Sequence, residues 1–152
     1  MLAAALSSIA LLPGLLTGTV DTVKQQTPLP ILLPNNFYSD FDPLYPYGGG
    51  DKKSYDLGVA GAPDCGGATA CFAASFSGEK GGKPYGRGKV TLAKGRHGRY
   101  QPMGCGASCS PPSISWKERG VTYTIQAKVV GKQSDRALLV KMANEAIKQG
   151  PR

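Results

Sequence analysis

Residues 113–127 read SISWKERGVTYTIQA and carry the clearest structural pattern in the chain. Ile114 and Trp116 fall on one face of a first strand, and Glu118-Arg119-Gly120 turns the chain after it. Beyond this turn, apolar residues alternate with Thr, Gln and Lys at the period of a strand: Val121, Tyr123, Ile125, Ala127 and Val129. The stretch therefore predicts a β-hairpin with one buried face.

Shorter runs with the same period extend the predicted sheet toward the N-terminus. Strands are predicted at residues 54–60, 70–77, 89–93 and 99–103. Phe72 and Phe76 bracket Ala74 on one face of the second of these runs. Residues 31–33 are predicted as a further short strand, because the surrounding prolines forbid a helix.

A helical pattern follows the hairpin at the C-terminal end. Ser134 is a suitable N-cap, Asp135 places an acid in the first turn, and Gly150-Pro151 ends the helix. One apolar stripe runs along it, formed by Leu139, Met142, Ala143, Ala146 and Ile147. The central core residues are predicted to be Trp116, Tyr123, Ile125, Leu139 and Met142.

These elements predict an α+β fold, with a meander-like antiparallel sheet of about five or six strands packed by one C-terminal helix. The composition agrees with this class. The 152 residues include 21 Gly and 12 Pro, which argues against a helical bundle, and 41% are hydrophobic, which argues against a disordered chain. The length suits one domain.

The first twenty residues carry no charged side chain, and Met1 to Leu16 read MLAAALSSIALLPGLL. Residues 1–20 are therefore predicted to be a signal peptide or a membrane anchor, with Pro13 and Gly14 interrupting its helix. The alternative is a buried helix of the folded domain. Residues 21–50 are predicted as a linker and cover loop rich in Pro and aromatic residues, and residues 51–152 as the disulfide-stapled domain.

The aromatic segment 37–50 reads FYSDFDPLYPYGGG. We expect an ordered loop that covers part of the core, and the functional alternative is an aromatic platform for carbohydrate. Asp40 and Asp42 have the spacing of a calcium loop, but the Gly and Glu ligands that should follow are absent.

Four cysteines occur in two short glycine-containing loops. Local pairing, Cys65 with Cys71 and Cys105 with Cys109, is favoured over cross-pairing because both loops are tight. A four-cysteine zinc site is less consistent with a spacing of five residues, and no Cys-x-x-Cys redox motif is present. Disulfides and the N-terminal segment both predict a secreted or extracytoplasmic protein.

No residue pattern predicts catalysis, a cofactor or a metal site. His97 lies among cations in a glycine turn, and no carboxylate nearby in the sequence would orient its ring. No Gly-x-Ser-x-Gly motif is present, and the glycines near residue 88 precede a strand rather than a helix. We therefore expect a protein that is not an enzyme.

The net charge is +8, and it is unevenly spread. Residues 59–152 hold fifteen bases and five acids, a net of +10. Seven of the bases fall between residues 80 and 99: Lys80, Lys83, Arg87, Lys89, Lys94, Arg96 and Arg99. A hairpin there would present a basic ridge to anionic lipid, to an acidic wall polymer or to another envelope protein. Nucleic acid is the least favoured partner of an exported protein, and the alternative to binding is a solvated loop.

The run CGASCSPPSISW at 105–116, the segment GVTYTI at 120–125 and the helix at 139–147 together resemble a family of uncharacterised exported bacterial proteins. The Trp-x3-Gly-x2-Tyr hairpin followed by a helix is also similar to a domain of unknown function at the extracytoplasmic end of anti-sigma-factor-like proteins. The resemblance implies an envelope location and a sheet with a helix. It implies no catalytic residues.

The sequence thus predicts a non-enzymatic exported or envelope-associated domain that binds an anionic surface or partner through residues 80–99. Two alternatives stay open at this point. One is a carrier of an apolar ligand between sheet and helix, and the other is a hydrolase in which the fold brings an acid or histidine against a serine.

Overall fold

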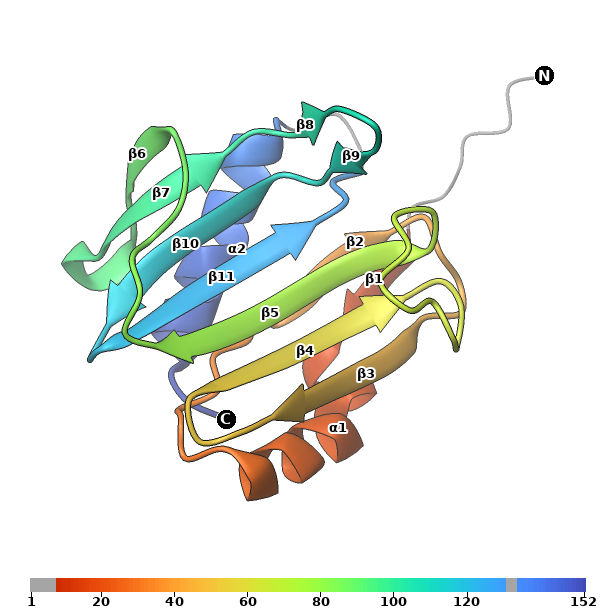
Figure 1. Cartoon of the computed structure of the whole chain (residues 1–152), viewed down its shortest axis with the longest axis horizontal. Coiled ribbons are helices and arrows are strands. Elements are labelled where there is room, and N and C mark those ends of the chain that lie inside the picture. The colour runs from red at the N-terminus through yellow and green to blue at the C-terminus, as the bar shows by residue number, and fades with distance from the viewer. Residues whose placement is uncertain (1–7, 131–133) are drawn as a thin grey trace.

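The structure, a computed structural model, describes residues 8–130 and 134–152. Its fold is α+β and is built on one antiparallel sheet of seven strands in the order β3-β4-β5-β11-β10-β7-β6 (Figure 1). The strands of this sheet are β3 (Tyr45–Gly50), β4 (Ser54–Ala60), β5 (Phe72–Lys80), β6 (Gly88–Thr91), β7 (His97–Gln101), β10 (Ser113–Glu118) and β11 (Val121–Ala127). The sheet thus has more strands than predicted, chiefly because the expected cover loop contributes β3.

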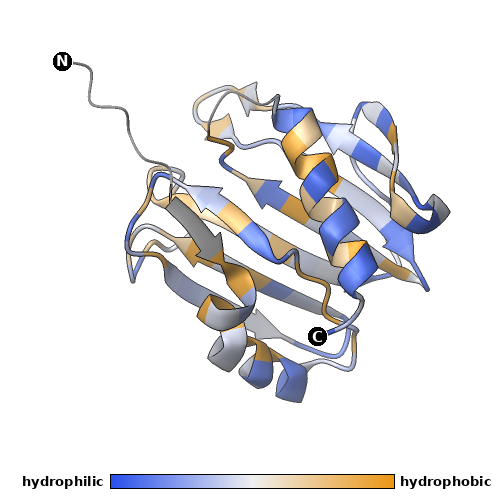
Figure 2. Cartoon of the chain, turned by 180° about the vertical axis from the view of Figure 1, so that it is seen from behind, coloured by the Kyte–Doolittle hydropathy of each residue, from blue (hydrophilic) through white to orange (hydrophobic). Residues whose placement is uncertain are grey.

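Smaller elements complete the chain. They are β1 (Ser8–Leu11), α1 (Leu12–Gln26), β2 (Asn36–Ser39), the short helix η1 (Ala93–Gly95), β8 (Gly104–Cys105), β9 (Cys109–Ser110) and α2 (Asp135–Gln149). β1 pairs with β2, and β8 pairs with β9, as two separate two-stranded ribbons. α1 and α2 lie on the same face of the large sheet, as the view from behind shows (Figure 2).

The predicted hairpin is formed by β10 and β11, in which Ile114 lies opposite Ile125 and Trp116 opposite Tyr123. Arg119 and Gly120 form its two-residue turn with φ of 50° and 79°, the positive values that match the twist of the strands. The five residues predicted as the central core are all buried: Trp116, Tyr123, Ile125, Leu139 and Met142. α2 begins as predicted, because the Ser134 side chain accepts a hydrogen bond from the Ala137 N–H.

The N-terminal segment requires a correction. Residues 12–20, predicted to belong to a targeting segment, form the first part of α1, and the buried side chains of this helix are Leu12, Leu16, Val20 and Val23. Pro13 stands in the first turn of α1, where proline is tolerated, so it begins the helix rather than interrupting it. The structure thus shows the alternative of a buried helix for residues 12–20, and residues 1–7 lie outside the described part.

The linker predicted at residues 21–50 is also part of the domain. Its first residues complete α1 and give that helix the polar face that the apolar run lacks. Its last residues form β3, on which α1 packs. Gly48 permits this contact, because a Cβ there would lie 2.9 Å from Thr19 Cγ2 and 2.8 Å from Leu57 Cδ2. No helix in the described ranges is long and apolar enough to cross a bilayer.

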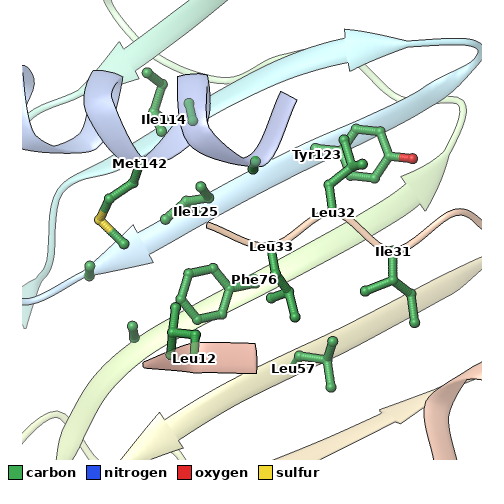
Figure 3. Close-up of a cluster of buried hydrophobic side chains, with 14 of the residues drawn as sticks. Leu12, Ile31, Leu32, Leu33, Leu57, Phe76, Ile114, Tyr123, Ile125 and Met142 are labelled. Atoms are coloured by element: carbon green, nitrogen blue, oxygen red, sulfur yellow. The ribbon is translucent and has the colours of Figure 1, made fainter. Parts of the chain in front are cut away.

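Residues 31–33 form no strand, although all three side chains are buried on the helix-bearing face of the sheet (Figure 3). Two tyrosine hydroxyls and the backbone of the C-terminal residue form hydrogen bonds with this segment, in place of a neighbouring strand. The Tyr123 hydroxyl donates to the Pro30 carbonyl at 3.0 Å, and the Leu32 N–H donates to the Tyr55 hydroxyl at 3.2 Å. The Arg152 backbone N–H donates to the Ile31 carbonyl at 2.9 Å. A fixed, buried connection between α1 and β2 results.

Replacing Tyr55 with Phe tests this arrangement. The buried Leu32 N–H loses its acceptor, and we expect the free energy of unfolding to fall by about 1–3 kcal/mol. Urea unfolding followed by circular dichroism measures the loss. Tyr85→Phe removes a hydroxyl from a residue that is 68% exposed and is the control, with no expected change. Equal stability of the two variants would contradict the role of Tyr55.

Candidate functional site

The face of the large sheet opposite the helices is polar and carries the candidate sites. Side chains of opposite charge lie at its two ends, joined by a row of directly paired neighbours: Asp56, Ser77, Thr124, Ser115, Arg99 and Lys89. Asp56 and Arg99 are separated by four strand spacings, which amounts to roughly 19 Å. The two ends are therefore distinct sites on one surface.

The loop from β5 to β6 crosses the basic end of this face (Figure 1). Ser115 on β10 fixes the loop, because its hydroxyl accepts from the Tyr85 N–H at 2.7 Å and donates to the Tyr85 carbonyl at 3.0 Å. The Thr122 hydroxyl donates to the Gly81 carbonyl at 2.6 Å. Gly86, with φ of 146°, allows close approach to β7, since a Cβ would lie 2.6 Å from the Tyr100 carbonyl.

A basic groove lies between this loop and the hairpin of β6 and β7. Its volume is about 640 Å³, and its lining residues are Lys83, Pro84, Lys89, Val90, Thr91, His97, Gly98 and Arg99. Lys89 and Arg99 are direct cross-strand neighbours, so their like charges face each other on adjacent strands. No acidic residue is among the lining residues, and the groove is suited to an anion.

The seven predicted bases do not form one continuous ridge. Lys83, Lys89 and Arg99 line the groove, whereas Arg96 forms an ion pair with Glu118 at 3.0 Å. The other three, Lys80, Arg87 and Lys94, are exposed elsewhere along this segment. One further base, Lys117 on β10, lies near this segment but was not predicted to belong to the basic ridge. Its ammonium donates to the Gly82 carbonyl at 3.4 Å.

His97 lines the same groove, and no hydrogen bond joins it to a serine or a carboxylate within the described residues. The described part of the chain also contains no group of three or more His, Cys, Asp or Glu side chains arranged to hold a metal ion. The space between α2 and the sheet is filled by buried side chains. A cavity between α2 and β2 measures only about 20 Å³ and would hold about one water molecule.

A second groove lies at the acidic end of the open face, with a volume of about 570 Å³. Its floor and one wall come from strands and consist of Tyr45, Pro46, Tyr47, Asp56, Ala60, Phe72, Ser75 and Gln126. The connection between β4 and β5, which contains the Cys65–Cys71 disulfide, supplies another wall, with Ala62, Pro63, Asp64, Cys65, Gly66 and Gly67. The aromatic segment of the sequence thus contributes two tyrosines to this groove.

A β-bulge brings Phe72 to this groove. The pairing of β4 with β5 shifts between Val59 and Ala60, so that Val59 faces Ala74 while Ala60 faces Phe72. The extra residue, Ala73, turns the preceding side chain to the other face of the sheet. Phe72 and Phe76, predicted to share one face, therefore lie on opposite faces, with Phe76 in the core and Phe72 in the groove.

Asp56 has an unusual environment in the second groove. Partial burial of its carboxyl group raises its pKa to about 6, although the residue as a whole keeps contact with solvent. The Asp56 carboxylate makes no hydrogen bond or ion pair within the described residues. Tyr47 also lines this groove and lies opposite Gly58, two residues along β4 from Asp56. Burial, followed by the charge of Asp56, raises the pKa of the Tyr47 hydroxyl.

Both disulfides have the predicted local pairing, Cys65–Cys71 and Cys105–Cys109, and no described cysteine is free. They indicate an oxidising, extracytoplasmic setting. Cross-pairing and a zinc site are therefore excluded as the state of these four residues. Each disulfide closes a surface loop, and the first of them shapes the second groove.

Comparisons of the chain with models of protein families, with curated proteins and with solved structures gave no match, so the family resemblance drawn from residues 105–150 stays a prediction.

Proposed function

We propose that this protein is a non-enzymatic extracytoplasmic binding domain that holds an anionic surface or polymer in its basic groove. The observation that carries the proposal is the cross-strand pair of Lys89 and Arg99, two like charges that face each other with no acid beside them in the groove. Such a pair is destabilising in a sheet. A phosphate or carboxylate group that contacts both side chains would offset this cost.

The geometry favours a weak, extended interaction over a tight small-molecule site. Lys83 and Lys89 are exposed, Arg99 is partly exposed, and the groove is open to solvent. Contacts with exposed charges each contribute less than about 1 kcal/mol, so affinity would come from several contacts at once. Binding should therefore weaken strongly as salt is added.

Anionic lipid headgroups and acidic wall polymers both offer repeated anionic groups to such a groove. Another envelope protein with an acidic surface is a further partner of the same chemistry. We propose that the groove, rather than residues 1–20, makes the contact with a membrane, because Leu12, Leu16 and Val20 are engaged in the core.

Charge reversal tests this proposal. The double variant Lys89→Glu and Arg99→Glu should lower retention on phosphatidylglycerol vesicles at least about tenfold. The matched control is Lys141→Glu with Lys148→Glu, which changes net charge equally on exposed positions of α2, on the other side of the sheet. It should retain binding within about twofold.

Competition with soluble polyphosphate tests whether the groove recognises a lipid headgroup within a bilayer or the anionic group of any polymer. If polyphosphate displaces the protein from vesicles, the groove recognises the anionic group itself rather than the bilayer. Equal losses of retention in the groove variant and in the α2 variant would instead mean that net charge alone drives binding, and the groove proposal would then be wrong.

A further inference from the structure

The second groove differs in charge from the rest of the chain. The protein carries a net charge of +8, yet the charged residues that line this groove are two acids, Asp56 and Asp64. Lys128, on the chain just beyond β11, directs its ammonium to the Thr69 and Ala70 carbonyls and over the Phe41 ring. The groove therefore offers negative charge to a ligand, the reverse of the basic groove.

Aromatic rings stand next to these carboxylates. Tyr47 packs over Gly58 on the neighbouring strand, where an added Cβ would lie only 2.2 Å from Tyr47 Cζ. The residue remains 38% exposed, so part of its ring is open to the groove. Tyr45 and Phe72 add two further rings to the lining. Ring faces combined with a carboxylate are the groups that bind organic ammonium ions in proteins.

We propose that this groove binds an organic cation, whose ammonium group lies against the Tyr47 ring and pairs with the Asp56 carboxylate. The Ser75 hydroxyl and the Gln126 amide oxygen line the groove and can contact polar groups attached to that cation, whereas the Gln126 amide nitrogen donates to the Pro111 carbonyl at 3.1 Å. The volume of about 570 Å³ falls in the range of small-molecule sites. The site is separate from the basic groove and does not depend on its function.

The state of Asp56 supports this assignment. Partial burial of its carboxyl group raises the pKa of Asp56 to about 6, although the residue as a whole is exposed, so its ionised form is disfavoured in the folded protein. A bound ammonium group would supply the missing counter-charge. The other titratable lining groups are Tyr45, Tyr47 and Asp64. The direct strand neighbours of Asp56 are Gly49 and Ser77, so neither β3 nor β5 places a cation opposite it.

The test uses choline as the probe, with its neutral carbon isostere as the matched ligand. Choline should produce saturable shifts in the amide NMR signals of Tyr47 and Asp56 in the whole chain, and the isostere should bind at least about tenfold more weakly. Equal affinity for the two compounds would overturn the proposal. Preferential binding of a neutral oligosaccharide would also overturn it, in favour of a carbohydrate platform.

Two variants locate the site, and one controls for charge. Asp56→Asn removes the counter-charge and should weaken choline binding at least about tenfold. Gly58→Ala should weaken it by displacing the Tyr47 ring, which is free to swing toward solvent. Asp21→Asn removes the same charge from an exposed position on α1 and should change nothing. Unchanged affinity in Asp56→Asn would refute the assignment.

The dependence on pH provides an independent readout. Choline binding should fall as the pH drops from about 8 to about 5, because Asp56 becomes protonated near pH 6. Since the folded pKa of Asp56 lies above its unfolded value, ionisation of Asp56 reduces stability as the pH rises. Asp56→Asn should therefore raise the melting temperature at about pH 8 and leave it unchanged below about pH 3, where the carboxyl group is protonated in both the folded and the unfolded chain.

The choline experiment is independent of the basic groove. The variant Lys89→Glu with Arg99→Glu should bind choline as the unmodified protein does, because its substitutions lie at the opposite end of the open face. Loss of vesicle retention with intact choline binding separates failure of one site from failure of the other. Loss of choline binding in this variant would contradict a separate site.

Discussion

Replacing Leu16 with Ala will lower the free energy of unfolding by about 2–5 kcal/mol. Leu16 has no exposed surface and lies on the side of α1 that packs on the sheet, together with Leu12, Val20 and Val23. Removing its side chain leaves a cavity between α1 and the sheet as well as losing the transfer free energy of the buried atoms. The total stability of a domain is typically about 5–15 kcal/mol, so the loss would be large.

Leu11→Ala is the matched control for this experiment, because Leu11 directly precedes the helix and is 68% exposed. Its substitution should change stability by less than about 0.5 kcal/mol. Urea unfolding of the whole chain, followed by far-UV circular dichroism, measures both variants. If Leu16→Ala proved as stable as the unmodified protein, α1 would not be part of the cooperative core, and residues 12–20 would again be candidates for a targeting segment.

The error over α1 has a physical cause. Read from Met1 to Leu16, the chain is apolar on every side and has no helical stripe. The helix in fact runs from Leu12 to Gln26, and its polar face comes from residues after position 20. A boundary placed at the first charged residue, Asp21, cut through the amphipathic pattern. The hairpin and α2 were predictable because their whole periods lie within uninterrupted stretches of sequence.

The second groove could be predicted only in part from the sequence. In YPYGGG, Tyr45, Tyr47 and Gly49 alternate with Pro46, Gly48 and Gly50, and this alternation indicates a strand with tyrosines on one side and small residues facing a helix. The turn-forming Pro and Gly residues of the same segment favour a loop, and this is why the sequence alone predicts one there. The bulge at Ala73 was not predictable, because it depends on the pairing of β5 with β4, which local periodicity does not reveal.

The basic groove was also predictable only in part from the sequence. The sequence located the basic segment, but closeness in sequence did not determine which bases meet in space. Arg96 pairs with Glu118, a residue of the distant β10 strand, while Lys89 and Arg99 are brought together by the register of β6 and β7. Lys117 was missed because it belongs to the hairpin rather than to the basic run.

Phe76→Ala should cause the largest loss of stability among the substitutions considered, about 3–5 kcal/mol. Phe76 is 1% exposed on β5, an inner strand that pairs with β4 and β11, and its direct neighbours on those strands are Leu57 and Ile125. Leu12 and Leu33 lie over the same part of the sheet (Figure 3). Truncation at this position therefore opens a cavity where α1, the buried connection and the sheet meet.

Phe72→Ala provides a matched comparison, because it removes the same side chain from the same strand four residues earlier. Without a bulge, Phe72 and Phe76 would share the buried face, and replacing either with Ala would lower the free energy of unfolding by a similar amount. Because the bulge turns Phe72 into the second groove, where it is only partly buried, we expect its loss to cost less than about 1.5 kcal/mol. Equal losses would show that Phe72 also belongs to the core, and the aromatic lining of the groove would then be reduced to the two tyrosines of β3.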